Sequence, residues 1–265
     1  MSRHQQPTHE QNILNNPSSK FDSDNYNPAP DLLKDRIIMV TGAGDGIGSV
    51  AARSFAKHGA TVALVGRTQA KLEAVYDAIE ADGSPTPTIA VIDFAKAQGD
   101  DYQNIADGLE EQFGRLDGLL HNAGILGHRS PIEHYEVKTW LDVMHVNLNA
   151  PFILTQTLLP LLQKSSGPSV VFTSSGVGRK GRAYWGAYAV SKFGTEGLMQ
   201  TLADEVENIR VNCINPGATR TAMRKVAYPG EDPTALLTPA DIMSTYLYLL
   251  GPDSKGISGQ SLDCQ

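Results

Sequence analysis

The chain has 265 residues and a formal net charge of −7, from 22 Lys and Arg against 29 Asp and Glu. This acidic balance argues against nucleic acid as a partner, because phosphate binding requires clustered Lys and Arg. The two cysteines, Cys213 and Cys264, belong to no CxxC motif or Cys/His cluster, so the sequence offers neither a disulfide framework nor a zinc site. It also lacks the GxSxG and HExxH motifs of serine hydrolases and zinc proteases.

The first 30 residues differ in composition from the rest of the chain. They contain four of the fifteen prolines, no glycine and no apolar periodicity. Such a segment buries too little apolar surface to offset its ordering entropy, so we expect a disordered extension over residues 1–30. The alternative is that part of this segment docks on the core.

The sequence contains no signal for secretion or for membrane insertion. The N-terminus has no apolar region of the kind found in secretory signals. The longest stretch without charged residues, 143–163, contains too many polar residues for a bilayer span. We therefore expect a cytoplasmic protein with no membrane partner.

From residue 31 onward, short apolar runs alternate with segments of helical pattern. The runs predict seven strands, at residues 36–41, 61–65, 88–93, 117–122, 168–175, 209–215 and 257–263. Strands that alternate with helices form parallel βαβ units, which need helices on both faces of the sheet. We therefore predict a single α/β domain over residues 31–265, built on a doubly wound seven-stranded parallel sheet (Rossmann fold).

Two further segments of this domain carry specific expectations. The longest helices are predicted over residues 139–163 and 188–207. Pro229, Gly230 and Pro233 interrupt the segment between residues 223 and 240. We expect this segment to form a mobile loop over a site.

The sequence TGAGDGIG (Thr41–Gly48) follows the first expected strand and opens the first expected helix. Gly42 allows a sharp turn, Gly46 lets the backbone approach a phosphate, and Gly48 lets the helix pack close to the sheet. The N–H groups and dipole of the helix start favour a pyrophosphate at this turn. A purely structural turn is the alternative, but the position in the first βαβ unit predicts a dinucleotide site.

The residues after the second strand bear on the choice of nucleotide. A carboxylate there would bind the ribose hydroxyls of NAD, but the chain reads VGRT and has its nearest acid at Glu73. The guanidinium of Arg67 suits the 2′-phosphate of NADP instead, although it could also be a solvated residue at a helix start. Asp45 in the glycine turn argues the other way, because it adds negative charge near the phosphates. We expect NADP(H), with NAD less favoured.

Tyr188 and Lys192 lie four residues apart on an expected helix and share one face of it. A YxxxK pair alone is a weak signal, because an ordinary amphipathic helix face gives the same pattern. Tyr188, however, opens the helix after the fifth strand, where doubly wound sheets bind ligands. Ser175 ends that strand, and its neighbour Ser174 faces the opposite way because side chains alternate along a strand.

Together these motifs resemble those of the short-chain dehydrogenase/reductase family. The resemblance rests on the glycine turn, HNAG (His121–Gly124), Asn147, Ser175 thirteen residues before Tyr188, Lys192, and NPG (Asn215–Gly217) before Thr221. It covers residues 31–265. Within the family, FTSSGVGRKGRAYWGAYAVSKFGTEG and RVNCINPGATRTAMR resemble the YciK-type bacterial oxidoreductases. His121 stands where the family more often has Asn, so it is a weaker candidate for the site.

The resemblance implies a role for each matching residue. Tyr188 is expected to be the general acid/base, and Lys192 to bind the nicotinamide ribose and lower the pKa of Tyr188. Ser175 would orient the substrate carbonyl, and Asn147 would complete a water-linked proton relay. The implied cofactor contacts are Gly42, Gly46, Ile47 and Gly48 for the pyrophosphate, Asp93 for the adenine, Asn122, Ala123 and Gly124 for the adenosine ribose, and Pro216, Gly217, Thr219 and Thr221 for the carboxamide.

Simple electrostatics agree with a role for Lys192 beside Tyr188. A free tyrosine has a pKa near ~10, so acting near ~7 requires a shift worth roughly 4 kcal/mol. One ammonium about 4 Å away at an effective dielectric near 20 supplies roughly 4 kcal/mol. We therefore expect Lys192 to bring the pKa of Tyr188 toward neutrality.

Pro151 gives Asn147 a possible second function through its backbone. Pro151 lies four residues later in the same expected helix and has no N–H. The carbonyl of Asn147 then loses its helical partner and can hold a water that links Lys192 to solvent. The alternative is that Pro151 only bends a packed helix.

The loop before Tyr188 is rich in cationic and aromatic residues: Arg179, Lys180, Arg182, Tyr184 and Trp185. It predicts either a cationic, aromatic-walled mouth for an anionic or aromatic carbonyl compound, or a solvated basic loop.

The leading functional hypothesis is hydride transfer between NADP(H) and a small-molecule carbonyl/secondary-alcohol pair. A narrower enzyme alternative is 3-oxoacyl-carrier-protein reduction, and a non-enzymatic alternative is a dinucleotide-sensing interaction protein on the same fold. The apolar content of helices 139–163 and 188–207, which look like the pair that forms subunit contacts in this family, favours a homodimer or homotetramer. Extra burial within the monomer is the alternative.

Overall fold

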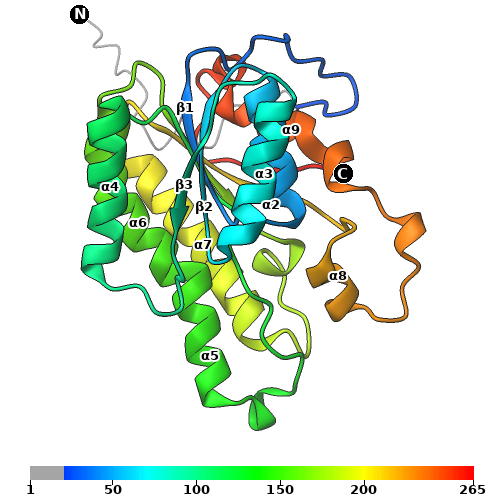
Figure 1. Cartoon of the computed structure of the whole chain (residues 1–265). Helices are drawn as coiled ribbons and strands as arrows, with labels where there is room; N and C mark the ends of the chain where they lie inside the picture. The colour runs from blue at the N-terminus through cyan, green and yellow to red at the C-terminus, as the bar shows by residue number, and fades with distance from the viewer. Residues whose placement is uncertain (1–20) are drawn as a thin grey trace, which may run out of the picture.

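The computed structural model describes residues 21–265 and contains one parallel sheet with the strand order β3-β2-β1-β4-β5-β6-β7 (Figure 1). The strands are β1 (Ile37–Thr41), β2 (Thr61–Gly66), β3 (Thr88–Val91), β4 (Gly118–His121), β5 (Ser169–Thr173), β6 (Arg210–Asn215) and β7 (Ser261–Asp263). The order reverses direction between β1 and β4, which creates the crevice where doubly wound sheets bind ligands. The predicted fold class is confirmed.

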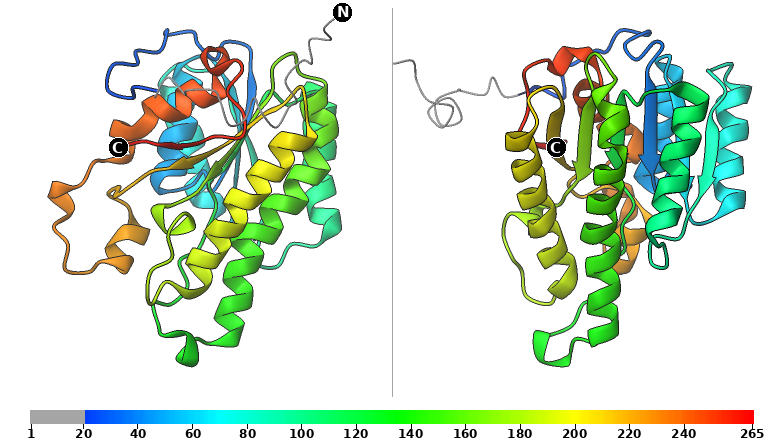
Figure 2. Two further views of the ribbon diagram at one scale, coloured as in Figure 1. Left: turned by 180° about the vertical axis from the view of Figure 1, so that it is seen from behind. Right: turned by 90° about the vertical axis from the view of Figure 1, so that its left-hand side faces the viewer.

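Helices cover both faces of this sheet (Figures 1 and 2). On one face pack α2 (Gly46–Lys57), α3 (Gln69–Ala81) and α9 (Met243–Leu250), and on the other α4 (Gly99–Phe113), α6 (Ala150–Gln163) and α7 (Gly186–Glu205). In β1, Ile38 and Val40 join the first core, while Ile37 and Met39 join the second. Burial on both faces explains why the parallel strands are continuous apolar runs.

The helix predicted over residues 139–163 is instead divided into three consecutive segments. These are α5 (Val137–Met144), a π-helical segment (His145–Asn149) and α6. The N–H of Ala150 donates to the carbonyl of His145, five residues earlier. Pro151 then lies in the first turn of α6, where a missing N–H is tolerated. The wider turn thus accommodates the proline and leaves Asn147 in a π-helical segment, a feature frequent at functional sites.

The last part of the N-terminal segment packs against the domain. The ring of Phe21 stacks on Tyr248 of α9 with centroids 4.1 Å apart, and the Tyr26 hydroxyl donates to Asp253 at 2.8 Å. For residues 21–30 the expected disorder is therefore wrong, and the docking alternative applies. Residues 1–20 lie outside the described part of the chain.

The segment between residues 223 and 240 contains regular structure that the sequence did not predict. A short helix, α8 (Ala222–Ala227), begins at Thr221, whose hydroxyl accepts the N–H of Arg224 at 3.1 Å. The last predicted strand is also shorter than expected, because only its final three residues pair with β6.

Within residues 21–265, no helix has the length and apolar composition needed to cross a membrane.

Candidate active site

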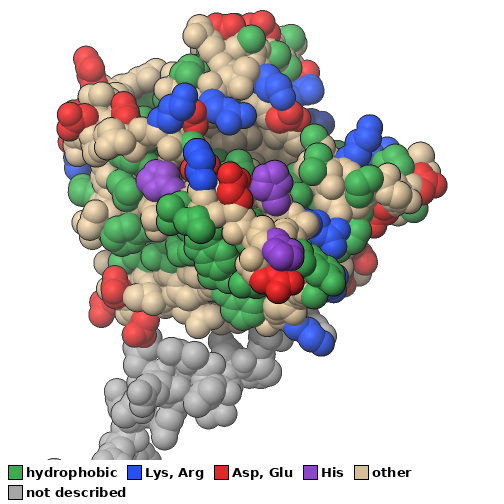
Figure 3. Space-filling view, turned by 90° about the horizontal axis from the view of Figure 1, so that it is seen from below, with side chains coloured by type: hydrophobic (Ala, Val, Ile, Leu, Met, Phe, Trp, Pro, Cys, Tyr) green, Lys and Arg blue, Asp and Glu red, His purple; other side chains and the backbone are tan. Residues whose placement is uncertain are grey.

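The candidate site residues follow the carboxyl ends of the strands, at the end of the sheet that Figure 3 views directly. Figure 3 shows hydrophobic side chains gathered beside acidic, basic and histidine side chains on this face. The glycine turn follows β1, Arg67 follows β2, Asp93 follows β3 and Ser175 follows β5. Because the strands are parallel, the sheet brings these segments to one edge.

The glycine turn has the backbone geometry that the sequence predicted. Gly42 and Gly46 adopt positive φ angles of 68° and 54°, which favour glycine. A Cβ on Gly48 would lie 2.2 Å from the Gly42 carbonyl oxygen, so only glycine fits there. Ile47 occupies the first turn of α2 between Gly46 and Gly48. The backbone of this turn and the start of α2 therefore fit a pyrophosphate.

The charge of Asp45 is offset by a cation that the sequence analysis missed. Asp45 caps α2 by accepting the N–H of Gly46 at 2.7 Å, and it forms an ion pair with Lys71 of α3. The hydrogen bond from Lys71 lowers the pKa of Asp45 below its ordinary value. Arg67 is exposed at the start of the same helix. Lys71 therefore offsets the charge of the acidic residue that argued against NADP.

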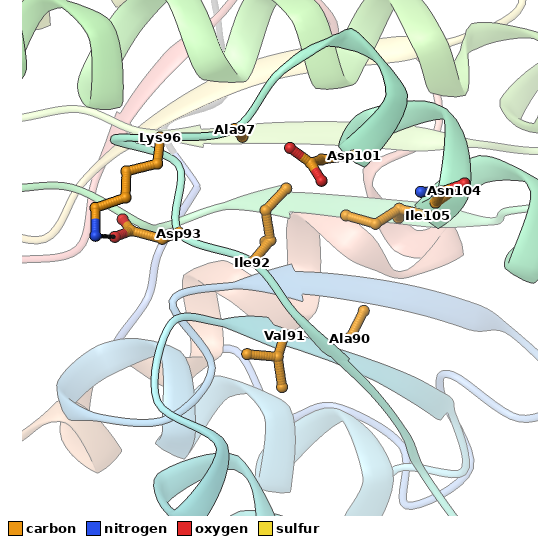
Figure 4. A pocket seen from close by; sticks show the side chains of 9 residues that line it. All are labelled: Ala90, Val91, Ile92, Asp93, Lys96, Ala97, Asp101, Asn104 and Ile105. Atoms are coloured by element: carbon orange, nitrogen blue, oxygen red, sulfur yellow. Dashed lines mark ion pairs between the residues drawn. The ribbon is translucent and has the colours of Figure 1, made fainter.

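Asp93 lies at a cavity of about 390 Å³ between β3 and α4 (Figure 4). One carboxylate oxygen accepts the N–H of Ala95 at 3.1 Å, and the other lies 3.9 Å from the ammonium of Lys96. Figure 4 shows the Asp93 and Lys96 side chains pointing toward each other. No contact links Asp93 to the glycine turn within the described residues.

Thr41, the last residue of β1, fixes the position of the segment after β4. Its hydroxyl accepts the N–H groups of Asn122 and Ala123 at 3.0 and 3.1 Å. A Cβ on Gly42 would lie 3.0 Å from the Cα of Ala123, so the glycine turn packs directly against this segment. The hydroxyl of Thr41 thus joins two of the predicted cofactor-binding segments.

Asn147 connects the segment after β4 to α7. Its side-chain oxygen accepts the N–H of Ile125 at 2.8 Å, and its amide donates to the Ile125 carbonyl at 2.9 Å and to Ser191 at 3.1 Å. The backbone carbonyl of Asn147 accepts a hydrogen bond from Thr195 at 3.4 Å. A Cβ on Gly124 would lie 3.3 Å from the Asn147 amide oxygen. The structure therefore brings Gly124 and Asn147 together beside α7.

Tyr188 and Lys192 lie together on α7. The ammonium of Lys192 is 5.7 Å from the ring centroid of Tyr188 and donates to the carbonyl of Thr173 at 2.7 Å. Burial raises the pKa of Tyr188 to about 12, and the nearby Ser175 side chain acts in the opposite direction. Burial likewise lowers the pKa of Lys192 to about 8.

The expected lowering of the Tyr188 pKa by Lys192 is therefore not found in this structure. A lowered pKa requires an ammonium close to the phenol oxygen. The Lys192 ammonium instead lies against the ring and is held by the end of β5. Burial then decides the direction, because it disfavours the charged phenolate.

The two adjacent serines at the end of β5 have different surroundings. Ser174 is buried and donates a short hydrogen bond to the carboxylate of Glu196, whereas Ser175 is half-buried and lies beside Tyr188. Glu196 also accepts a hydrogen bond from Ser261 of β7 at 2.9 Å and lies 3.6 Å from the guanidinium of Arg179. Ser174 thus belongs to a buried network that holds β5, β7 and α7 together.

The segment after β6 closes the site on the side opposite the glycine turn. Gly217 has a φ of 72°, and the hydroxyl of Thr219 donates to the Pro216 carbonyl at 3.0 Å. The side chain of Gln265 donates to the same carbonyl at 2.6 Å. The methyl group of Thr221 lies 3.7 Å from where a Cβ on Gly46 would be, so this segment faces the glycine turn.

His121 is a core residue in this structure. It is 4% exposed, stacks on Phe172 with ring centroids 4.7 Å apart, and shares a hydrogen bond with Thr155 at 2.8 Å. Burial lowers the pKa of His121 to about 3, so the ring is neutral at physiological pH.

The cationic loop before Tyr188 is divided between two environments. Arg179 forms an ion pair with Asp263 at 2.8 Å, and Lys180, Arg182 and Tyr184 are exposed. Trp185 is buried, and its ring centroid lies 5.6 Å from that of Tyr188. Of the five residues, Trp185 alone packs against Tyr188 within the described part of the chain.

A second group of side chains beside Tyr188 was missed by the sequence analysis. Trp185 packs against Tyr228, which follows α8, and the guanidinium of Arg129 lies 5.0 Å from the ring centroid of each. Arg224 lies 3.9 Å from the Tyr228 centroid. No local motif connects residues 129, 185 and 228, so only the folded chain reveals this group. Glu196, in contrast, follows Lys192 by one helical turn, a signal that the sequence did contain.

Comparison with known proteins supplies the family. The model of the short chain dehydrogenase family matches residues 36–232. The oxidoreductase YciK of Escherichia coli (strain K12) is 54% identical over 241 residues, which cover 91% of this chain and 96% of that protein.

Two similar crystal structures contain a dinucleotide. A short chain dehydrogenase from Shigella flexneri 2a str. 301, complexed with NADP, is 53% identical with a TM-score of 0.88, and the match covers 89% of this chain and all of the other. Another, from Escherichia coli CFT073 and complexed with NADPH, is 55% identical with a TM-score of 0.88 and covers 90% and 100%. The chain therefore belongs to the short-chain dehydrogenase/reductase family of oxidoreductases.

Proposed function

We propose that this protein transfers a hydride between NADP(H) and a carbonyl/secondary-alcohol pair, with Tyr188 as the general acid/base. The observation that carries the proposal is the gathering of Ser175, Tyr188 and Lys192 beside the segments that fit a dinucleotide. The NADP and NADPH bound to the two similar dehydrogenases support the choice of cofactor.

Residues of this chain would hold each part of the cofactor. The glycine turn would bind the pyrophosphate, and Arg67 with Lys71 would face the 2′-phosphate. Asn122–Gly124 and the segment from Pro216 to Thr221 would hold the adenosine ribose and the carboxamide. When bound, NADPH would supply the hydride for reduction, and NADP⁺ would accept it in the reverse reaction.

The protonated state of Tyr188 fits the role of proton donor when a carbonyl is reduced. Because the pKa of Tyr188 is about 12, its hydroxyl keeps its proton at neutral pH and can donate it to the substrate oxygen as the carbonyl carbon accepts hydride. The hydroxyl of Ser175 orients that oxygen. The phenolate that remains then needs a new proton. Tyr188 would regain its proton through Lys192 and a water held at Asn147. The side chain of Asn147 already donates a hydrogen bond to Ser191, which lies on α7 next to Lys192.

The test combines calorimetry with a carbonyl screen on the purified protein. We expect NADPH to bind and at least one carbonyl compound to be reduced, and Tyr188→Phe to retain NADPH binding while turnover falls roughly 10²- to 10⁴-fold. Tyr76→Phe on α3, far from the site, is the matched control and should be unaffected. Nucleotide binding without turnover on the whole panel would favour the sensing alternative. Turnover confined to acyl thioesters would favour the carrier-protein reductase.

We also propose a homodimer or homotetramer formed through the helices beside the site. Large apolar side chains remain exposed on α5, α6 and α7, namely Leu141, Phe152, Val190 and Phe193. Exposed apolar area on adjacent helices is typical of an interface. Light scattering on the wild type and Phe193→Glu tests the proposal, because the variant should shift to smaller assemblies. A monomeric wild type would contradict it.

A further inference from the structure

Arg129 places a positive charge close to Tyr188 without belonging to the catalytic group. It lies in the loop after β4, with its guanidinium carbon 5.0 Å from the ring centroid of Trp185. The centroid of Trp185 is in turn 5.6 Å from that of Tyr188. One aromatic ring therefore separates this cation from the tyrosine that would carry the proton.

Two other arginines near the site have carboxylate partners. Arg224 donates two hydrogen bonds to Glu231, at 2.6 and 2.5 Å, and Arg179 pairs with Asp263. Among residues 21–265, no Asp or Glu forms an ion pair with Arg129, whose one hydrogen bond is to the carbonyl of Ala227. A guanidinium has five N–H donors, so most of those on Arg129 remain available for a ligand.

The aromatic contacts hold the guanidinium in place. Trp185 and Tyr228 each lie 5.0 Å from its carbon, a distance at which a cation is attracted to a ring face. A planar arginine that is already positioned loses less conformational freedom when it binds a carboxylate, and it can do so with two parallel bonds. Its surroundings are thus those of an anion-binding residue.

An apolar cluster lies beside this cation and Tyr188, and its accessible side is formed by the half-buried Tyr188, Met223 and Tyr228. Leu126, Val177, Trp185, Ala189 and Ala227 form one buried cluster, against which Tyr188, Met223 and Tyr228 pack. This cluster contains no charged side chain. A ligand that reaches from Tyr188 to Arg129 would therefore lay an apolar body against this wall and present an anionic end to the arginine.

We infer that Arg129 is a specificity-determining residue that binds a carboxylate on the substrate. The substrate class is thus a carbonyl compound with an apolar body and a carboxylate remote from the reacting carbon. This inference rests on the proposed function, since it describes the substrate of the same site. It also moves the cationic recognition from the loop before Tyr188 to the loop after β4.

The test compares benzoylpropionate with its methyl ester. The two compounds share the aromatic ketone, and the carboxylate lies far enough from the carbonyl that its charge barely changes the ketone's reactivity. We expect the wild type to prefer the acid in kcat/KM. Arg129→Gln should lower kcat/KM for the acid roughly 10- to 100-fold and change that for the ester only slightly, and Arg129→Lys should be intermediate.

The control is Lys225→Gln on α8, which removes one exposed positive charge that forms no ion pair within the described residues. It should leave the acid-to-ester ratio unchanged. An equal loss for acid and ester in Arg129→Gln would overturn the inference, because the arginine would then only fasten α8 through Ala227. Equal kcat/KM for acid and ester in the wild type would overturn it as well.

A binding measurement separates this inference from the proposed function. Calorimetry on the protein saturated with NADP⁺, which cannot reduce the ketone, should give tighter binding of benzoylpropionate than of its ester, with the difference lost in Arg129→Gln. Equal binding, or no binding of either compound, would overturn the inference. Arg129-dependent binding together with no reduction of any carbonyl by NADPH would overturn the proposed function and leave the inference standing.

Discussion

The proposed cofactor side and the proposed substrate side of this site lie at one end of the sheet but are built from different parts of the chain. On the cofactor side the backbone sets the geometry, through the positive φ of Gly42 and the close approach of Gly48 to the Gly42 carbonyl. On the substrate side, side chains set it, through Arg129 and two aromatic rings. Backbone geometry tolerates few residue types, whereas side-chain geometry can change by substitution. The difference explains how one fold can keep its cofactor while its substrate varies.

The largest effect that tests this comparison is expected at the two adjacent serines that follow β5. Ser175→Ala should lower kcat roughly 10²- to 10³-fold with the substrate found in the screen, as removal of one transition-state donor does elsewhere. Ser174→Ala should leave kcat within a few-fold but lower the free energy of unfolding by about 1–3 kcal/mol, because the buried carboxylate of Glu196 loses a donor. Steady-state kinetics and urea unfolding measure the two effects. Equal losses of kcat would contradict the assignment of Ser175.

A substitution at Gly48 tests whether the backbone geometry of the glycine turn controls cofactor binding. A Cβ there would lie 2.2 Å from the Gly42 carbonyl and 2.6 Å from the Asn122 amide, so the turn must shift. We expect Gly48→Ala to weaken NADPH binding by about 1–3 kcal/mol, roughly 5- to 150-fold, by calorimetry. Gly44→Ala is the comparison, because the nearest atom to its Cβ would be the Cβ of Lys71 at 3.0 Å, which requires a smaller shift than the 2.2 Å contact at Gly48. Similar losses in both variants would show that the turn is simply intolerant of any side chain.

The difference between backbone geometry and side-chain geometry also decides which parts of the site could be predicted from the sequence. The glycine turn was predictable, because its residue types report a local backbone geometry. The group formed by Arg129, Trp185 and Tyr228 was not, because its members are distant in sequence and meet only after α8 packs. The pKa of Tyr188 was predicted in the wrong direction, since sequence spacing gives a shared helix face but not the bond from Lys192 to Thr173. Pro151 indicated a disturbed helix, but its π-helical form required the structure.

Lys192 lies where the two sides meet, and its burial predicts a pH-dependent stability. Its pKa falls from 10.5 to about 8 on folding, so between these values the unfolded chain binds a proton that the folded protein does not. The free energy of unfolding therefore gains a contribution that rises with pH across this window, by about 2 kcal/mol between pH 8 and roughly pH 10. Urea unfolding of the wild type and Lys192→Met over this range should give curves that diverge by that amount. Parallel curves would mean that Lys192 keeps its ordinary pKa in the folded protein.

The smallest effect concerns the choice of nucleotide on the cofactor side. Arg67 is exposed, so its interaction with a 2′-phosphate is weakened by solvent and is worth about 1 kcal/mol, or roughly five- to tenfold in affinity. Arg67→Ser should weaken NADPH binding by this factor and leave NADH binding unchanged, by calorimetry at low salt. Lys71→Gln serves as a comparison, because it removes the partner of Asp45 and leaves that carboxylate uncompensated beside the turn. It should therefore weaken both nucleotides, since the added repulsion acts on the pyrophosphate that they share. If Arg67→Ser weakened NADH as much as NADPH, the arginine would act on the common part of the cofactor and would not be the source of selectivity for the 2′-phosphate.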